Sequence, residues 1–124
     1  MNLNQITVPS LDIDRSVHFY KMLGLKPIVL SPHYARFECP AGEATFSVHL
    51  VDDLAKGEGV WVYFELDNLD EQVSELRAMG MEFEELPQDK PWLWREARLR
   101  DPFGTLLVLY HAGTNRKNPP WRVQ

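Results

Sequence analysis

Two segments of this sequence combine residues that could carry out chemistry with the alternation of a β-strand. His49 lies within residues 45–51, and Glu96 and Arg98 share one side of residues 94–100. A histidine can act as a general base, and an arginine can stabilise a developing oxyanion. These types would suit proton abstraction by His49 next to Glu96, with Arg98 holding an enolate-like oxygen. On an amphipathic strand, His49 could equally be a core histidine that is hydrogen bonded to a neighbour.

Successive side chains of a strand point to opposite faces, so strand parity collects further residues on the same side as these three. That side is rich in Trp and Tyr, unlike an ordinary solvated face. We favour a ligand cavity lined by aromatic rings and a few fixed polar groups over the alternative, a wet protein interface. The predicted catalytic residues are His49 and Glu96, and the predicted ligand-binding residues are Gln5, Trp61, Tyr63, Glu65, Trp94 and Arg98.

An internal repeat predicts the elements that position these residues. Residues 12–25 and 68–81 are the same unit written twice, which indicates two related halves. Each copy has an Asx where a helix N-cap belongs, a glycine where the C-terminal cap belongs, and apolar residues at helical spacing between them. The apolar positions are Ile13, Val17, Tyr20 and Leu23 in the first copy and Leu69, Val73, Leu76 and Met79 in the second.

Strand-like segments surround each predicted helix. They are residues 3–8, 26–31, 34–39 and 45–51 in the first half, and residues 61–66, 82–86, 94–100 and 105–111 in the second. The order βαβββ in each half predicts an α+β fold. The second half is longer than the first, and residues 87–94 are the natural place for its extra residues.

The composition is that of an ordinary globular domain. The chain has 124 residues, of which 44% are apolar and 25% charged, and its net charge is -5. We predict a single domain, with module one at about 1–56, module two at about 57–112 and a tail at 113–124. Scattered Lys and Arg argue against nucleic-acid binding, and no apolar run is long enough for a membrane span. Cys39 is the single cysteine, and with no targeting signal evident the chain is expected to be cytoplasmic.

The repeat, its first helix and one turn together resemble a known superfamily. The residues that carry the resemblance are Leu-Asp-Ile-Asp-Arg-Ser-Val-His-Phe-Tyr at 11–20, Leu-Gly-Leu at 23–25 and Asp-Pro-Phe-Gly at 101–104. This pattern is similar to the vicinal oxygen chelate superfamily, which includes glyoxalase I, extradiol dioxygenases and the fosfomycin- and bleomycin-resistance proteins. The resemblance covers about residues 1–112. It implies two tandem βαβββ modules that form a half-open, curled mixed sheet around a central cavity, with the helices on the outer face and often with a homodimer.

Metal enzymes of this superfamily place ligands on the first strand of each module and near the end of each module. Carried over to this sequence, those positions are Gln5 and His49, then Trp61 and Val108. An indole N–H has no lone pair to donate and valine has no donor atom, so at most half of the usual set survives. We therefore assign no metal ligand and expect no cofactor. The alternative is a rebuilt site that binds Zn, Ni, Mn or Fe. A shift of the last register by two would bring Tyr110 inward, and Glu65 or Glu96 would substitute from neighbouring inward positions.

Two functions follow from the resemblance and the ligand count. The first is a small-molecule-binding protein of the glyoxalase/bleomycin-resistance type with a degenerate metal site, which holds an aromatic or amphipathic compound between Trp61, Tyr63 and Trp94. The alternative is a metal-dependent lyase or dioxygenase that resembles glyoxalase I with rebuilt ligands, and whether the protein is an enzyme stays open. A homodimer is expected, and Trp121 in the tail is expected to dock on its own subunit or on a dimer mate.

Overall fold

The computed structural model describes residues 1–123 and divides them into two compact units. The first unit comprises Met1–Gly59 and Asp101–Thr105, and the second comprises Val60–Arg100 and the residues from Leu106 on. Each unit contains one α-helix and one four-stranded mixed sheet. The α+β class and the two βαβββ repeats predicted from the sequence are confirmed.

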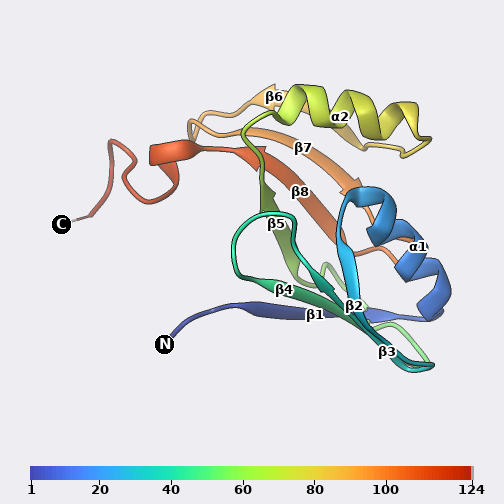
Figure 1. Cartoon of the computed structure of the whole chain (residues 1–124). Coiled ribbons are helices and arrows are strands. Elements are labelled where there is room, and N and C mark those ends of the chain that lie inside the picture. Colours follow the sequence, from blue (N-terminus) through green and yellow to red (C-terminus); the bar gives the residue numbers. More distant parts are fainter. Residues whose placement is uncertain (124) are drawn as a thin grey trace. The chain divides into compact units, whose positions relative to one another are not determined.

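The first unit has the sheet order β1-β4-β3-β2. Its elements are β1 (Gln5–Ser10), α1 (Ile13–Leu23), β2 (Lys26–Leu30), β3 (Tyr34–Glu38) and β4 (Thr45–Leu50). β1 runs parallel to β4, and the other neighbouring strands are antiparallel. α1 packs against β2, β3 and β4, so one face of this sheet is covered by its helix (Figure 1).

The second unit repeats this arrangement with the order β5-β8-β7-β6. Its elements are β5 (Trp61–Glu65), α2 (Leu69–Ala78), β6 (Glu85–Asp89), β7 (Arg95–Arg100), β8 (Leu106–His111) and the short 3-10 helix η1 (Gly113–Arg116). β5 is parallel to β8, and α2 packs against β6 and β8 (Figure 1). Across residues 1–123, none of the helices has the length and hydropathy needed to cross a membrane.

The helix ends follow the predicted caps more closely in the first copy than in the second. Asp12 accepts a hydrogen bond from the backbone N–H of Arg15 at 3.2 Å, and Gly24 takes the left-handed φ of 114° that a helix C-terminus needs. Asn68 makes no side-chain capping bond at the start of α2. Met79 was predicted to share the apolar face of α2, but it is the C-cap residue of that helix and is 53% exposed.

The largest departure from the predicted strands is at β6, which begins later than the predicted segment 82–86. β6 pairs with β7 in a hairpin that is closed by a hydrogen bond from Lys90 N–H to the Trp94 carbonyl at 2.8 Å. Residues 87–94 therefore lengthen this hairpin. A proline and polar residues have low strand propensity, but β6 is an edge strand, where a proline is tolerated.

A buried tyrosine ties the turn at Asp101–Thr105 to α1. The Tyr20 hydroxyl donates to Asp101 Oδ2 at 2.7 Å, while Asp101 Oδ1 accepts from the backbone N–H groups of Phe103 and Thr105 at 2.9 and 3.0 Å. Burial, reinforced by the charge of Asp101, raises the pKa of Tyr20. These bonds explain why a turn that precedes the last strand of the second module packs with the first unit.

Candidate functional site

One face of the second sheet, the face turned away from α2, collects most of the residues predicted to form a site. Val108 on β8 lies between Tyr63 on β5 and Arg98 on β7. Side chains of directly paired residues point to the same face of a sheet. We call this face the polar face of the second unit. Its members are Trp61, Tyr63, Glu65, Trp94, Glu96, Arg98, Leu106, Val108 and Tyr110.

Three aromatic rings pack together on this face and form what we call the aromatic cluster. Trp94 stacks on Tyr110 with ring centroids 4.6 Å apart and ring planes at 18°. Tyr63 meets these two rings edge-on, with centroids 5.9 and 5.6 Å away. Burial raises the pKa values of Tyr63 and Tyr110, so both phenols stay neutral at ordinary pH. Tyr63 is 40% exposed, which leaves one ring of the cluster open to a ligand.

The charged side chains beside the cluster are already paired with one another. Glu96 is only 1% exposed, and its two oxygens accept from the Trp92 indole N–H at 2.5 Å and from Arg98 Nη2 at 3.3 Å. Arg98 Nε lies 3.5 Å from a carboxylate oxygen of Glu85, which also pairs with Lys90. The buried charge of Glu96 is thus compensated within the unit, as a buried carboxylate requires.

Trp61 lies next to the guanidinium group of Arg98 on the same face. Arg98 Cζ is 5.3 Å from the centroid of the Trp61 ring, which is within the range of a cation–π contact. The Trp61 side chain is 41% exposed. Trp61 and Tyr63 are two residues apart on β5, so this strand presents two partly exposed rings on one face.

Glu65 has a structural role that the sequence did not reveal. Its Oε2 accepts from the backbone N–H groups of Ala112 and Gly113 at 2.8 and 2.9 Å, and its Oε1 lies 3.6 Å from Arg116 Nε. Burial raises the pKa of Glu65, but the two N–H donors and Arg116 outweigh burial and lower it below its usual range. Glu65 therefore anchors the start of η1.

In the first unit, Gln5 and His49 lie on the sheet face turned away from α1. Gln5 Oε1 accepts from the Thr45 hydroxyl at 2.7 Å, and His49 is exposed and paired in register with Tyr34. The predicted site residues did not include Tyr34 and Arg36, which share this face; Arg36 Nε donates to the Tyr34 phenol oxygen at 2.9 Å. Strand parity, applied to β3 as it was to β4, could have found them.

The predicted catalytic pair is divided between the two units. His49 belongs to the first unit and Glu96 to the second. Both oxygens of Glu96 are occupied by donors of its own unit. Assistance of His49 by Glu96 therefore stays a prediction.

The strand register corrects one equivalence that was assumed for the metal positions. β1 pairs with β4, and β5 pairs with β8, in the same parallel register. In that register His49 is equivalent to Tyr110, and Val108 is equivalent to Ser47. The first assignment, which set Val108 beside His49, is therefore corrected in favour of the alternative that moves the last register by two and brings in Tyr110.

The side chains at the expected metal positions of the second unit do not fit a metal ion. Trp61 has no lone pair to donate and lies beside a guanidinium cation, and Val108 is buried without a donor atom. The two glutamates that could rebuild a site, Glu65 and Glu96, already accept hydrogen bonds. Within residues 1–123, no three His, Cys, Asp or Glu side chains are grouped so that they could hold an ion.

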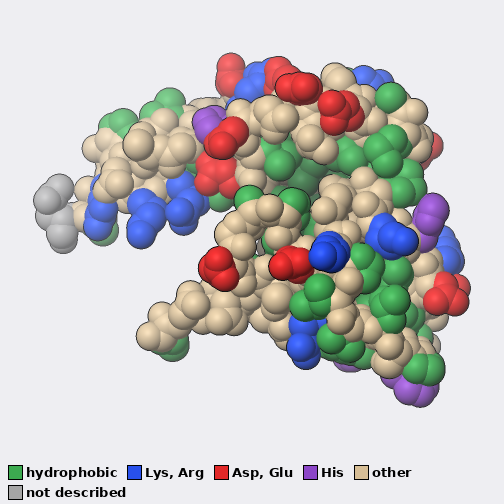
Figure 2. Space-filling model, in the orientation of Figure 1, with side chains coloured by type: hydrophobic (Ala, Val, Ile, Leu, Met, Phe, Trp, Pro, Cys, Tyr) green, Lys and Arg blue, Asp and Glu red, His purple; other side chains and the backbone are tan. Residues whose placement is uncertain are grey.

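The segment after η1 carries an exposed tryptophan among basic residues. Trp121 is 58% exposed, and Figure 2 shows basic side chains gathered on this part of the chain. Docking of Trp121 on its own subunit is therefore not observed. Docking on a dimer mate stays a prediction.

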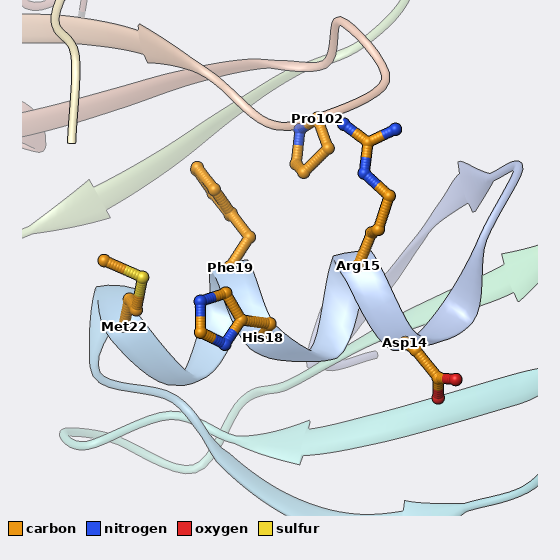
Figure 3. Close-up of a pocket in the computed structure, with 6 residues that line it drawn as sticks. All are labelled: Asp14, Arg15, His18, Phe19, Met22 and Pro102. Carbon is orange, nitrogen blue, oxygen red and sulfur yellow. The ribbon is translucent and has the colours of Figure 1, made fainter. Parts of the chain in front are cut away.

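A shallow depression lies on the outer side of α1. Figure 3 shows Arg15 and Phe19 pointing from α1 toward Pro102, which comes from the turn bonded to Tyr20. None of its lining side chains is buried. The depression thus lacks the fixed, buried polar groups that orient a small ligand. Its lining residues are Asp14, Arg15, His18, Phe19, Met22 and Pro102.

Comparison with known proteins gives one family and a consistent fold. The family model described as the Glyoxalase/Bleomycin resistance protein/Dioxygenase superfamily matches residues 2–109. A glyoxalase/bleomycin resistance protein/dioxygenase from Nocardioides is similar with a TM-score of 0.80 and 25% identity, over 100% of this chain and 90% of that chain. No curated protein matches this sequence.

Two further solved structures share the fold at lower identity. A bleomycin-binding protein complexed with bleomycin has a TM-score of 0.75 and 22% identity, over 90% of this chain and 98% of that chain. A lactoylglutathione lyase from Agrobacterium tumefaciens has a TM-score of 0.75 and 18% identity, over 98% of this chain and 97% of that chain. Binding proteins and enzymes therefore share this fold, and the choice between these functions depends on the site.

Proposed function

Because the chain belongs to the glyoxalase/bleomycin resistance protein/dioxygenase superfamily, we propose that it is a small-molecule-binding protein whose site includes the polar face of the second unit. The proposed ligand has a planar aromatic part. It stacks on Trp61 and Tyr63, and the nearby guanidinium group of Arg98 orients its polar atoms. No metal ion takes part.

The observation that carries this proposal is the exposure of two rings on a packed support. Trp61 and Tyr63 are 41% and 40% exposed, while the rings and strands beneath them are packed. Aromatic rings bury a large area and prefer stacked or edge-on neighbours, with about 0.5–1.5 kcal/mol for a pair beyond area burial. An aromatic ligand would complete contacts that these two rings leave open.

The state of the carboxylates supports a function without a metal. A rebuilt metal site would have to take Glu96 from Trp92 and Arg98, and would leave the guanidinium group next to the ion. Both changes are costly in a partly buried site. We therefore place the metal-dependent lyase or dioxygenase second, and with it any Zn, Ni, Mn or Fe cofactor.

A relative of the same fold binds bleomycin. From this relative we take only the class of function, which is small-molecule binding. The ligand of this chain is to be identified by experiment. We also propose that the protein is a homodimer and is located in the cytoplasm. Exposed apolar side chains on the edge strand β2, such as Ile28 and Leu30, support the homodimer.

Calorimetric titration with planar compounds and their saturated analogues tests the proposal, starting with 2-naphthol and decahydro-2-naphthol. The wild-type protein should bind the aromatic member of each pair more tightly. Trp61→Ala and Tyr63→Ala should each weaken that binding by about tenfold. Trp121→Phe changes an exposed aromatic residue of the tail and should have no effect. Equal binding of flat and saturated compounds, or unchanged binding by both alanine variants, would contradict the proposal.

A further inference from the structure

Arg36 on β3 is a fixed cation whose charge is not compensated by a carboxylate. It is half-buried, its Nε donates to the Tyr34 phenol oxygen at 2.9 Å, and its Cζ lies 5.4 Å from the centroid of the Tyr34 ring. Among residues 1–123, no Asp or Glu side chain forms an ion pair with it. The two terminal nitrogens, Nη1 and Nη2, have no acceptor in the part of the chain that the structure describes.

The second copy of the repeat shows what an arginine at this position needs. Arg98 is equivalent to Arg36, since Arg36 pairs with Ser47 on β4 and Arg98 pairs with the equivalent residue Val108 on β8. Arg98 is held between two carboxylates, Glu85 and Glu96. In the first copy, the strand partner of Arg36 is Val29, which stands where Glu85 pairs with Arg98.

The second carboxylate is missing in the same way. Glu96 precedes Arg98 by two residues, and the residue at that place before Arg36 is Tyr34. The repeat has thus kept the cation in both copies and has replaced both of its carboxylates by a valine and a phenol in one of them. Because Arg36 has no counter-charge beside it and its terminal nitrogens make no bond to an acceptor of the described chain, an external anion would be favourable there.

Ser47 helps to hold the Tyr34 phenol to which Arg36 donates. Ser47 is fully buried, its hydroxyl is 2.6 Å from that of Thr7, and it is the strand partner of Arg36. Hydrogen bonding from Ser47, followed by Arg36, lowers the pKa of Tyr34. The other titratable groups on this face are Glu38, which makes no ion pair with Arg36, its strand partner Lys26, and His49.

We propose that Arg36 and Tyr34 form a binding site for the carboxylate group of a small organic acid. Nε of Arg36 is used by Tyr34, but the fork made by Nη1 and Nη2 can hold both oxygens of one carboxylate. A single cation matches the single charge of a carboxylate. The site lies within the first unit, and it does not depend on the aromatic cluster of the second.

The test uses the Arg36 Nε–H signal in NMR spectra of the whole ¹⁵N-labelled chain, assigned by its loss in Arg36→Gln. Cyclohexanecarboxylate is titrated against cyclohexanecarboxamide, which has the same shape without the charge. Neither probe is aromatic, so failure of the proposed aromatic site would not affect the result. The carboxylate should shift the signal in a saturable way, and the carboxamide should not. Equal shifts with both probes, or none with either, would overturn the proposal.

A second variant installs the carboxylate that the other copy of the repeat has. Val29→Glu places an acid beside Arg36 on an exposed edge position, and it should weaken binding of cyclohexanecarboxylate by about tenfold or more. Arg77→Gln lowers the net charge by the same one unit, but at the surface of α2, and it should leave binding unchanged. Binding to Val29→Glu at wild-type affinity would contradict the assignment. If Val29→Glu does not fold, the comparison of cyclohexanecarboxylate with cyclohexanecarboxamide on the wild-type chain still tests the proposal.

Discussion

Glu96 is a buried carboxylate with both oxygens engaged, one by Trp92 and the other by Arg98. Strand parity correctly places it on the same face as Arg98, but parity does not give the partners of a side chain. The indole of Trp92 comes from the β6–β7 hairpin, whose path depends on strand pairing and not on local sequence. For that reason the sequence indicates a reactive acid, and the structure shows a paired one.

Glu96→Gln should therefore destabilise the protein strongly. The substitution removes one partner of a buried ion pair and leaves Arg98 with less compensation, at a cost of about 3 kcal/mol in the free energy of unfolding. Urea denaturation measures the change. Glu84→Gln, which removes an exposed partner of Arg100 at 2.9 Å, serves as the control and should cost less than about 1 kcal/mol. Similar small effects of both variants would mean that Glu96 is not held as described.

Tyr20 should make the protein less stable at alkaline pH. Its pKa in the folded chain is raised by burial and by Asp101, while in the unfolded chain it is about 10. Its contribution is therefore fully present below about pH 10, and it is lost as the pH rises further, at up to about 1.4 kcal/mol per pH unit.

Tyr20→Phe tests this pH dependence. At neutral pH the variant should be less stable by about 1–3 kcal/mol, because Asp101 loses its buried donor. Between about pH 9 and 11, the variant should lose less stability than the wild type in urea titrations. Parallel pH profiles of the two proteins would show that Tyr20 does not carry the effect.

At the scale of elements, α1 could be predicted closely because its signals are local. Asp12, the apolar spacing and Gly24 all lie within or beside the helix. The position of β6 and the partners of Glu65 could not be predicted, because both depend on which strand or loop approaches from elsewhere in the chain. Strand parity could have placed Tyr34 and Arg36 on the sheet face turned away from α1. It could not have shown that Arg36 lacks a carboxylate partner.

Glu65 connects β5 to η1, and Glu65→Gln should loosen that connection. A neutral amide accepts more weakly from the Ala112 and Gly113 N–H groups and loses the attraction to Arg116. Hydrogen–deuterium exchange at these two amides should become faster, while exchange in α2 stays unchanged. Because the pKa of Glu65 is lowered on folding, the wild type should keep its protection down to acidic pH and lose it as the pH falls through that lowered pKa. Unaltered exchange of both amides in the variant would contradict this role.

At the scale of the whole molecule, the repeat could be recognised from sequence alone because the two copies agree in type and register. The sequence could not give the assembly, since exposed apolar side chains on β2 and at Trp121 indicate an interface without naming its partner. We expect sedimentation equilibrium to give twice the chain mass of 14.4 kDa. Leu30→Lys, on the exposed edge of β2, should shift the equilibrium toward the monomer, whereas Lys26→Gln should not. A wild-type protein that stays at the mass of one chain would contradict the homodimer.

We propose that the second unit binds an aromatic ligand without a metal ion. The most direct measurement is a calorimetric titration of planar aromatic compounds into protein treated with chelator, repeated after addition of Zn, Ni, Mn or Fe(II). The affinity should be the same in both states, and Trp61→Ala should lower it. Binding that appears only after one of these metals is added would contradict it and would favour the metal-dependent enzyme.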